Sequence, residues 1–292
     1  MKVSGFTFIR NAIKYDYPIV EAIRSILPIC DEVVVAVGAS DDDTLSLIES
    51  IDPDKVKIVQ TTWDDSLREG GSVLAIETDK AFAHISKDAD WAFYIQGDEV
   101  IPEQSLDVIF SKMKTYKDTD DVDGLLFRYL HFYGSYDYVG TSSNWYHHEI
   151  RVVKNDSAIY SYKDAQGFRK GDNEKLSVVP IEAWVYHYGW VKEPKAMQEK
   201  QKSFNKFWHD DAWMEKHIAD VEAYDYSEGM QTLKRFHGKH PAVMQERIAR
   251  KNWNFDSDLS FSKMSFKDRV KSFFREKIGI ELGYKNYRIK RF

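Results

Sequence analysis

The stretch WAFYIQGDEVIP, residues 91–102, contains the transition on which the fold prediction depends. An aromatic and aliphatic run ends at Gln96-Gly97, and two adjacent carboxylates, Asp98 and Glu99, follow it. Desolvating an unpaired carboxylate is costly, whereas a carboxylate at the exit of a strand can point into a crevice. We therefore predict a buried strand over 91–95 whose carboxyl end opens onto a polar site.

Residues 1–116 alternate between strand-like and helix-like patterns. The expected strands are 3–9, 32–37, 56–60 and 91–95, and the expected helices are 17–27, 45–51, 72–86 and 103–116. This alternation predicts an α/β fold with a mostly parallel central sheet flanked by helices. In such sheets, ligands bind outside the carboxyl ends of the strands.

The pattern changes after residue 123. Strand-like runs at 124–134, 149–155, 176–180 and 183–190 have no long helix between them, which indicates a mixed or antiparallel part. From residue 194 the pattern is helical again and rich in aromatic residues. We expect one domain over 1–192 and a helical C-terminal extension over 193–292.

Composition excludes several classes of protein. Of the 292 residues, 43% are hydrophobic and 30% charged, and no apolar run approaches the ~18 residues of a membrane span. The first residues do not resemble a signal peptide, and Cys30 is the only cysteine, so we expect a cytoplasmic protein without disulfides. The body is acidic, which argues against nucleic acid as a partner.

The C-terminal end is basic. Residues 263–292 carry ten Lys and Arg against three Asp and Glu. The apolar residues that recur on one helical face are Phe266, Val270, Phe273, Phe274 and Ile278. Such a helix suits the headgroup layer of an anionic membrane, at the inner face of the cell membrane for a cytoplasmic protein. The alternative is a terminal helix docked on the body.

Four segments share their order and spacing with a known family: FTFIRN (6–11), VVVAVGASDDDT (33–44), GGSVLAIETDKAFAHI (70–85) and FYIQGDEVIP (93–102). Together they resemble the GT-A nucleotide-diphospho-sugar transferase fold of bacterial family-2-like glycosyltransferases, over about two thirds of the chain. The resemblance implies a GT-A catalytic domain over 1–192. It also implies a metal-dependent, inverting, hexosyltransferase-type enzyme that transfers a sugar from a UDP- or GDP-linked donor to a glycan or lipid-linked acceptor, in cell-surface polysaccharide synthesis.

Asp98 and Glu99 stand where the family has its Asp-x-Asp metal motif. Two carboxylates suit Mn²⁺ or Mg²⁺, although they would equally suit the acidic first turn of the following helix. The resemblance implies His187, in WVYHYGW, as a further ligand, and an imidazole beside a carboxylate suits Mn²⁺. Two departures from the family pattern are Gln96, in place of the first Asp, and Gly38, near the position of an Asp that reads uracil.

The resemblance implies that the donor nucleotide or its diphosphate is bound by Arg10, Asn11, Asp41, Asp42, Lys80 and Gln96. Arg10 and Lys80 could equally be solvated surface charges. An inverting transfer needs a carboxylate that takes the proton of the acceptor hydroxyl. Asp164, in SYKDAQGFR, is the first candidate for this base, with Glu149 and Asp172 in reserve. The aromatic residues of 124–138 and 145–146 could stack on an acceptor sugar or pack in the core.

Two other functions remain open from the sequence. A nucleotidyltransferase would have a Gly-rich loop after the first strand, and IRNAIKYDYP (9–18) contains no glycine. A catalytically silent GT-A-like module that binds a glycan or a partner protein is favoured by Gln96 and Gly38. Nucleotide binding would separate this module from a transferase.

Overall fold

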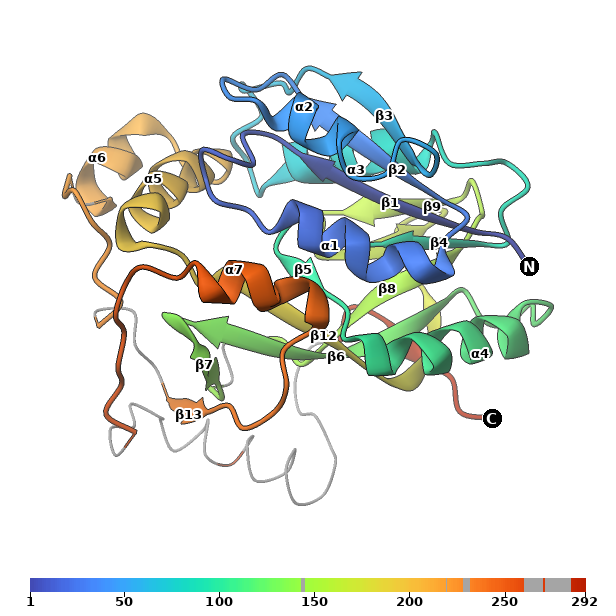
Figure 1. Cartoon of the computed structure of the whole chain (residues 1–292). Helices are drawn as coiled ribbons and strands as arrows, with labels where there is room; N and C mark the ends of the chain where they lie inside the picture. Colours follow the sequence, from blue (N-terminus) through green and yellow to red (C-terminus); the bar gives the residue numbers. More distant parts are fainter. Residues whose placement is uncertain (143–144, 219, 228–231, 260–269, 271–284) are drawn as a thin grey trace.

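The computed structural model describes residues 1–142, 145–218, 220–227, 232–259, 270 and 285–292. Most of its strands form one mixed sheet in the order β13-β7-β6-β8-β4-β1-β2-β3, with β12 beside β6, and with β5 and β14 beside β12 (Figure 1). Its strands are β1 (Val3–Ile9), β2 (Glu32–Gly38), β3 (Val56–Thr61), β4 (Trp91–Tyr94), β5 (Glu99–Val100), β6 (Gly124–Tyr133), β7 (Ser135–Gly140), β8 (His148–Lys154), β12 (Ser177–Trp190), β13 (Leu233–Arg235) and β14 (Arg288–Ile289). A smaller sheet contains β9 (Ile159–Tyr162), β10 (Gly167–Lys170) and β11 (Glu174–Lys175).

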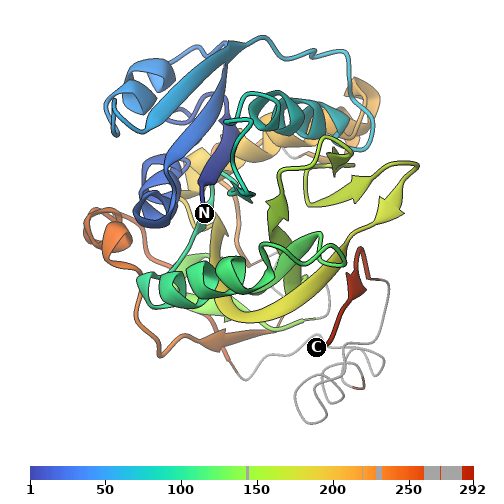
Figure 2. The same cartoon turned by 90° about the vertical axis from the view of Figure 1, so that its right-hand side faces the viewer.

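Helices cover both faces of the sheet (Figures 1 and 2). The helices of the first half are α1 (Ile19–Ile26), α2 (Thr44–Glu49), α3 (Ser72–Phe82) and α4 (Leu106–Tyr116). One buried cluster joins α1, α2 and α4 to one face, and a second joins α3, β9 and β10 to the other. Alternation along β2 explains the two clusters, because Val33, Val35 and Val37 belong to the first and Val34 and Ala36 to the second.

The N-terminal half confirms the expected α/β architecture. β1 pairs in parallel with β2 and β4, and β2 pairs in parallel with β3. From β4 onwards, antiparallel pairs with β8 and between β6, β7 and β8 give the sheet its mixed character. The two runs expected at 176–180 and 183–190 form one long strand, β12, with an irregularity between Pro180 and Trp184.

The segment after residue 193 is helical in part, with α5 (Pro194–Phe204), α6 (Asp211–His217) and α7 (Gln245–Ala249). It also contributes β13 and β14 to the main sheet. No helix within the described part of the chain is long and apolar enough to cross a membrane. Most of the basic amphipathic segment expected within 263–292 lies outside the described residues.

Candidate functional site

A cavity of about 750 Å³ lies where β1, β2 and β4 end. Arg10 and Asn11 follow β1, Asp41 follows β2, and Asp98 follows β4, and all four line it. Parallel strands bring these residues together, because their carboxyl ends meet at one edge of the sheet. The C-terminal segment contributes another wall, whose lining residues include Lys200, Phe204, Phe207 and Trp208.

The chain turns tightly between β4 and β5. The Glu99 backbone N–H donates to the Gln96 carbonyl (3.1 Å), and the Gln96 N–H donates to the Glu99 carboxylate (3.1 Å). The Gln96 side-chain amide donates to the Ala165 carbonyl (3.1 Å) and fastens this turn to the β9–β10 loop. Gln96 lines the cavity, and its contacts show that it holds the turn.

Glu99 and Asp98 lie in different surroundings. Glu99 is fully buried and does not line the cavity. Its two carboxylate oxygens accept hydrogen bonds from Arg151 at 2.7 and 2.8 Å. The Tyr129 hydroxyl also donates to it (2.8 Å). Both oxygens are therefore engaged by protein, which does not agree with the expectation that Glu99 ligates a metal beside Asp98. The physical reason is that Asp98 lies in the turn whereas Glu99 begins β5, so the two side chains leave the backbone in different directions.

Asp98 faces the cavity between two partners that come from distant parts of the chain. The Lys200 ammonium on α5 donates to Asp98 Oδ2 (3.2 Å) and to the Gly189 carbonyl (2.9 Å). His187 Nε2 on β12 lies 3.7 Å from Asp98 Oδ1. Burial alone would raise the pKa of Asp98, but the charges of Lys200 and Lys192 and the hydrogen bond from Lys200 outweigh it and hold the pKa well below its usual range. The carboxylate therefore stays ionised.

Asp98 and His187 fit a divalent cation. A carboxylate oxygen and an imidazole nitrogen are both good ligands for Mn²⁺. Gly189 keeps the space beside them open, because a Cβ there would lie 2.6 Å from both Asp98 Oδ2 and His187 Cε1. No group of three or more His, Cys, Asp or Glu that could hold a metal occurs among the described residues. The pair alone supplies two ligand atoms, so a cation bound there would need further ligands from elsewhere.

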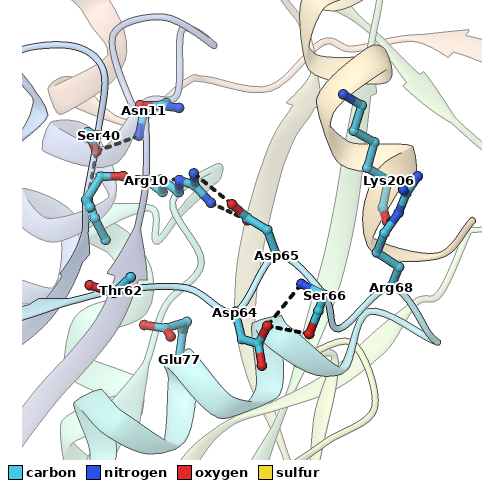
Figure 3. Close-up of polar contacts among 12 residues, drawn as sticks. Arg10, Asn11, Ser40, Thr62, Asp64, Asp65, Ser66, Arg68, Glu77 and Lys206 are labelled. Atoms are coloured by element: carbon cyan, nitrogen blue, oxygen red, sulfur yellow. Dashed lines mark hydrogen bonds and ion pairs between the residues drawn. The ribbon is translucent and has the colours of Figure 1, made fainter. Parts of the chain in front are cut away.

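A loop over residues 62–71 borders the cavity beside β1 (Figure 3). Arg10 forms an ion pair with Asp65 on this loop (2.6 Å), and its guanidinium carbon lies 5.6 Å from the centre of the Trp63 ring. Arg68 pairs with Asp211 (2.8 Å) and donates to the Lys206 carbonyl (3.0 Å). These contacts connect the loop to β1 on one side and to the C-terminal segment on the other.

Asn11 joins the loops that follow β1 and β2. Its side-chain oxygen accepts from the Asp41 backbone (2.7 Å), and its own backbone N–H donates to the Ser40 hydroxyl (3.0 Å) (Figure 3). Its φ of +54° lies in the left-handed region, which Asn tolerates better than most residues. Asn11 thus sets the shape of this edge of the cavity.

Asp42 and Lys80 lie outside the cavity lining. Asp42 accepts from the backbones of Lys14 (2.7 Å) and Thr44 (3.0 Å), so it closes the loop that precedes α2. The Lys80 ammonium binds Glu77 on the same helix (2.6 Å). Their expected contact with the donor has no support in this geometry.

Asp164 is the base candidate that reaches the cavity. It sits in the β9–β10 loop between Lys163 and Ala165, which have φ values of +56° and +62°. Burial raises the pKa of Asp164. Glu149, on β8, is buried and does not line the cavity, and Asp172 is exposed beyond β10. Among the three carboxylates, Asp164 alone lines the cavity.

The aromatic residues expected near an acceptor divide into two groups. Trp145 and Tyr146 line the cavity, and Trp190 on β12 joins them. Tyr136 and Tyr138, which lie on β7, belong instead to two buried clusters. Part of the aromatic pattern therefore reflects core packing.

Two residues of the site were not among the sequence candidates. Lys200 lies in a helix that looks like an ordinary charged surface helix, and only its burial, at 7% exposure, distinguishes it. His131, on β6, is 2% exposed and lines the cavity behind His187. A histidine inside an apolar strand was the one available signal for His131.

No family model matches the chain, and no curated protein matches it. Among solved structures, it is similar to residues 1–349 of Staphylococcus aureus TarS in complex with UDP, at 18% identity and a TM-score of 0.43. That likeness covers 69% of this chain and 64% of the TarS structure, which is less than two thirds of the latter.

Two further solved structures are similar over part of the fold. One is glucosyl-3-phosphoglycerate synthase from Mycobacterium tuberculosis in complex with Mn²⁺, UDP and phosphoglyceric acid: 17% identity, TM-score 0.30, with 44% of this chain and 43% of that one covered. The other is 4-diphosphocytidyl-2C-methyl-D-erythritol synthase from Anaerococcus prevotii: 10% identity, TM-score 0.36, with 65% and 91% covered.

Proposed function

We propose that this protein is a glycosyltransferase that transfers a sugar from a nucleoside-diphosphate donor bound in the cavity. The observation that carries the proposal is the convergence of Asp98 and His187, each largely buried, at the carboxyl edge of the parallel strands. Their donor atoms suit a cation that a diphosphate would help to hold, and the cavity is large enough for a nucleotide sugar.

Mn²⁺ or Mg²⁺ would be held by Asp98 and His187. When bound, such an ion stabilises the negative charge that develops on the leaving diphosphate. Lys200 adds a positive charge of the protein itself at the same place, held by Asp98 and the Gly189 carbonyl. Tyr17 and Phe204 surround this ammonium group, which strengthens its electrostatic effect by excluding water.

The nucleoside end of the donor, UDP- or GDP-linked, is proposed to lie along the edge formed by β1 and β2. Arg10, Asn11 and Asp41 line this part of the cavity. Arg10 is the group best suited to a phosphate, because its guanidinium can exchange the exposed carboxylate of Asp65 for a phosphate oxygen. We leave Asp42 and Lys80 out of the donor site.

The acceptor is proposed to enter beside Trp145 and Trp190, with Asp164 as the base of an inverting hexosyl transfer. A raised pKa suits a base, because the conjugate acid is then formed more readily during proton transfer. Indole rings offer flat surfaces for a sugar, which supports a glycan or a lipid-linked glycan as acceptor. Such acceptors are the substrates of cell-surface polysaccharide synthesis.

Calorimetric titration with UDP, GDP and CMP, each with and without Mn²⁺, tests the proposal. We expect one nucleoside diphosphate to bind, more tightly with Mn²⁺, and Asp98→Ala to remove the effect of the metal. Release of that nucleotide from its sugar conjugates would then identify the donor. If none of the nucleotides binds under either condition, the transferase proposal fails and the silent binding module is favoured.

Membrane contact through residues 263–292 stays a prediction. Deleting the segment would be an unsuitable test, because it would remove β14 and the buried Tyr287. Replacing Lys267, Lys271 and Lys277 with Gln in the full chain keeps both. We expect this variant to lose sedimentation with vesicles containing anionic lipid, and equal sedimentation would contradict the membrane prediction.

A further inference from the structure

His131 is a buried imidazole that contacts His187 and to which the proposed function gives no role. We propose that His131 is a positioning residue: it fixes the tautomer of His187, so that the lone pair of His187 Nε2 faces Asp98 Oδ1. This inference rests on the proposed function, because it assigns the residue that prepares the cation site of the same cavity.

The hydrogen-bond partners of His131 determine its own tautomer. Its Nε2 lies 2.7 Å from the carbonyl oxygen of Tyr146, and a carbonyl can only accept. Nε2 therefore carries a proton. The ring is 2% exposed and stacked on Trp145, and burial of this kind disfavours the charged form. A neutral ring with its proton on Nε2 has a lone pair on Nδ1.

His187 must then donate from Nδ1. The Nδ1 atoms of the two rings are 3.2 Å apart, so one donates and the other accepts. Because His131 Nδ1 is the acceptor, the proton lies on His187 Nδ1, and His187 Nε2 has the lone pair. The other tautomer would place two lone pairs against each other inside the protein, which would leave both nitrogens without a partner.

The consequence appears at Asp98. His187 Nε2 and Asp98 Oδ1 face each other at 3.7 Å, beyond the usual length of a hydrogen bond. With no proton on Nε2, both atoms are electron-rich, and a positive ion between them would satisfy both. His131 engages the far nitrogen of His187, and Lys200 engages the far oxygen of Asp98. Hydrogen bonds thus hold His187 at Nδ1 and Asp98 at Oδ2, and they leave His187 Nε2 and Asp98 Oδ1 available for a cation.

Two variants separate positioning from packing. In His131→Asn, the side-chain oxygen takes the place of Nδ1 and still accepts from His187, but the donor to Tyr146 is lost. In His131→Gln, the amide nitrogen takes the place of Nε2 and keeps the bond to Tyr146, but the acceptor for His187 is lost. A residue that only packs would respond alike to both changes.

The first measurement is the tautomer of His187 in the full chain without metal or nucleotide. Long-range ¹H–¹⁵N correlation spectra of histidine-labelled protein report it, and His187→Gln assigns the signal. We expect a proton on Nδ1 in the wild type and in His131→Asn, and on Nε2 in His131→Gln. A proton on Nε2 in the wild type would overturn the proposal.

The second measurement is Mn²⁺ affinity, by titrating MnCl₂ into each protein alone and with UDP. We expect His131→Gln to bind Mn²⁺ about 10- to 100-fold more weakly and His131→Asn to stay near the wild type. Equal losses in both variants, or no loss in His131→Gln, would overturn the proposal. Absence of nucleotide binding to the wild type would instead contradict the proposed function, while the tautomer would still decide the role of His131.

Discussion

The buried ion pair between Glu99 and Arg151 is expected to stabilise the fold, independently of any ligand in the cavity. Both side chains are fully buried, and two hydrogen bonds of 2.7 and 2.8 Å join them. Glu99→Gln keeps the size of the side chain and removes its charge. Arg151 stays protonated under all ordinary conditions, so the variant contains a buried cation whose counter-charge is lost.

The expected loss follows from the geometry. Removing one partner of a buried ion pair costs about 3 to 5 kcal/mol, and the lower end applies here because glutamine can still accept one bond from Arg151. For a chain of this size, each kcal/mol lowers the melting temperature by about 2 to 4 °C. We therefore expect Glu99→Gln to melt roughly 6 to 12 °C below the wild type.

Thermal unfolding followed by circular dichroism in EDTA measures this loss, and Glu182→Gln is the matched control. Glu182 pairs with Arg128 at the surface, where the two side chains are 72% and 41% exposed. Such a pair contributes about 0 to 1 kcal/mol, so its loss should change the melting temperature by at most a few degrees. The double variant Glu99→Leu/Arg151→Met should recover much of the stability, because no buried charge remains.

The same experiment distinguishes the two roles considered for Glu99. A metal ligand would lose Mn²⁺ affinity on substitution and keep its stability in EDTA. A structural carboxylate would lose stability in EDTA. If Glu99→Gln melted within a degree or two of the wild type and bound Mn²⁺ more weakly, the structural role assigned to Glu99 would be refuted.

Three further predictions concern the cavity and its surroundings. Gly189→Ala should abolish Mn²⁺-enhanced nucleotide binding in calorimetry, because its Cβ would lie 2.6 Å from atoms of Asp98 and His187; unchanged binding would contradict the cation site. Asp164→Asn should lower the transfer rate about 10²- to 10⁴-fold and leave nucleotide affinity unchanged, whereas loss of affinity would make Asp164 a binding residue. Burial raises the pKa of Asp79 to about 6, so its ionisation should destabilise the fold as pH rises from about 4 to 6. The free energy of unfolding of Asp79→Asn should therefore exceed that of the wild type by about 1 to 3 kcal/mol at pH 8 and equal it at pH 4. Thermal unfolding measures this, and the same difference between the two proteins at both pH values would exclude the effect.

The sequence was most informative where one physical rule dominated. The run from Glu32 to Gly38 is apolar apart from its ends and contains four valines, and both faces of β2 are covered in the structure. Strands buried on both faces allow few alternatives, so β1, β2 and β4 could be predicted, together with the sheet edge where they end. The position of Asp98 at that edge follows from the same reasoning.

Side-chain direction was harder to predict than strand position. Asp98 and Glu99 are both carboxylates, and grouping them by chemistry placed both in one metal site. The turn between β4 and β5 separates them, because Asp98 lies in the turn and lines the cavity, whereas Glu99 begins β5 beside Arg151. Arg151 is 52 residues away along the chain, so the partner that gives Glu99 its role could not be inferred from the local pattern.

The segment after residue 193 contributes directly to the cavity, although the sequence suggests a separate helical extension. Lys200 is 102 residues from Asp98 along the chain, and yet it supplies the nearest positive charge to that carboxylate. Phe204 and Trp208 add an aromatic wall, and Arg68 connects the loop over 62–71 to Asp211 in the same segment. A carboxylate buried to this extent needs a counter-charge, and the largest contribution that lowers the pKa of Asp98 comes from Lys200 on α5. The division at residue 192 therefore separates two patterns in the sequence, while residues from both sides of it line one cavity.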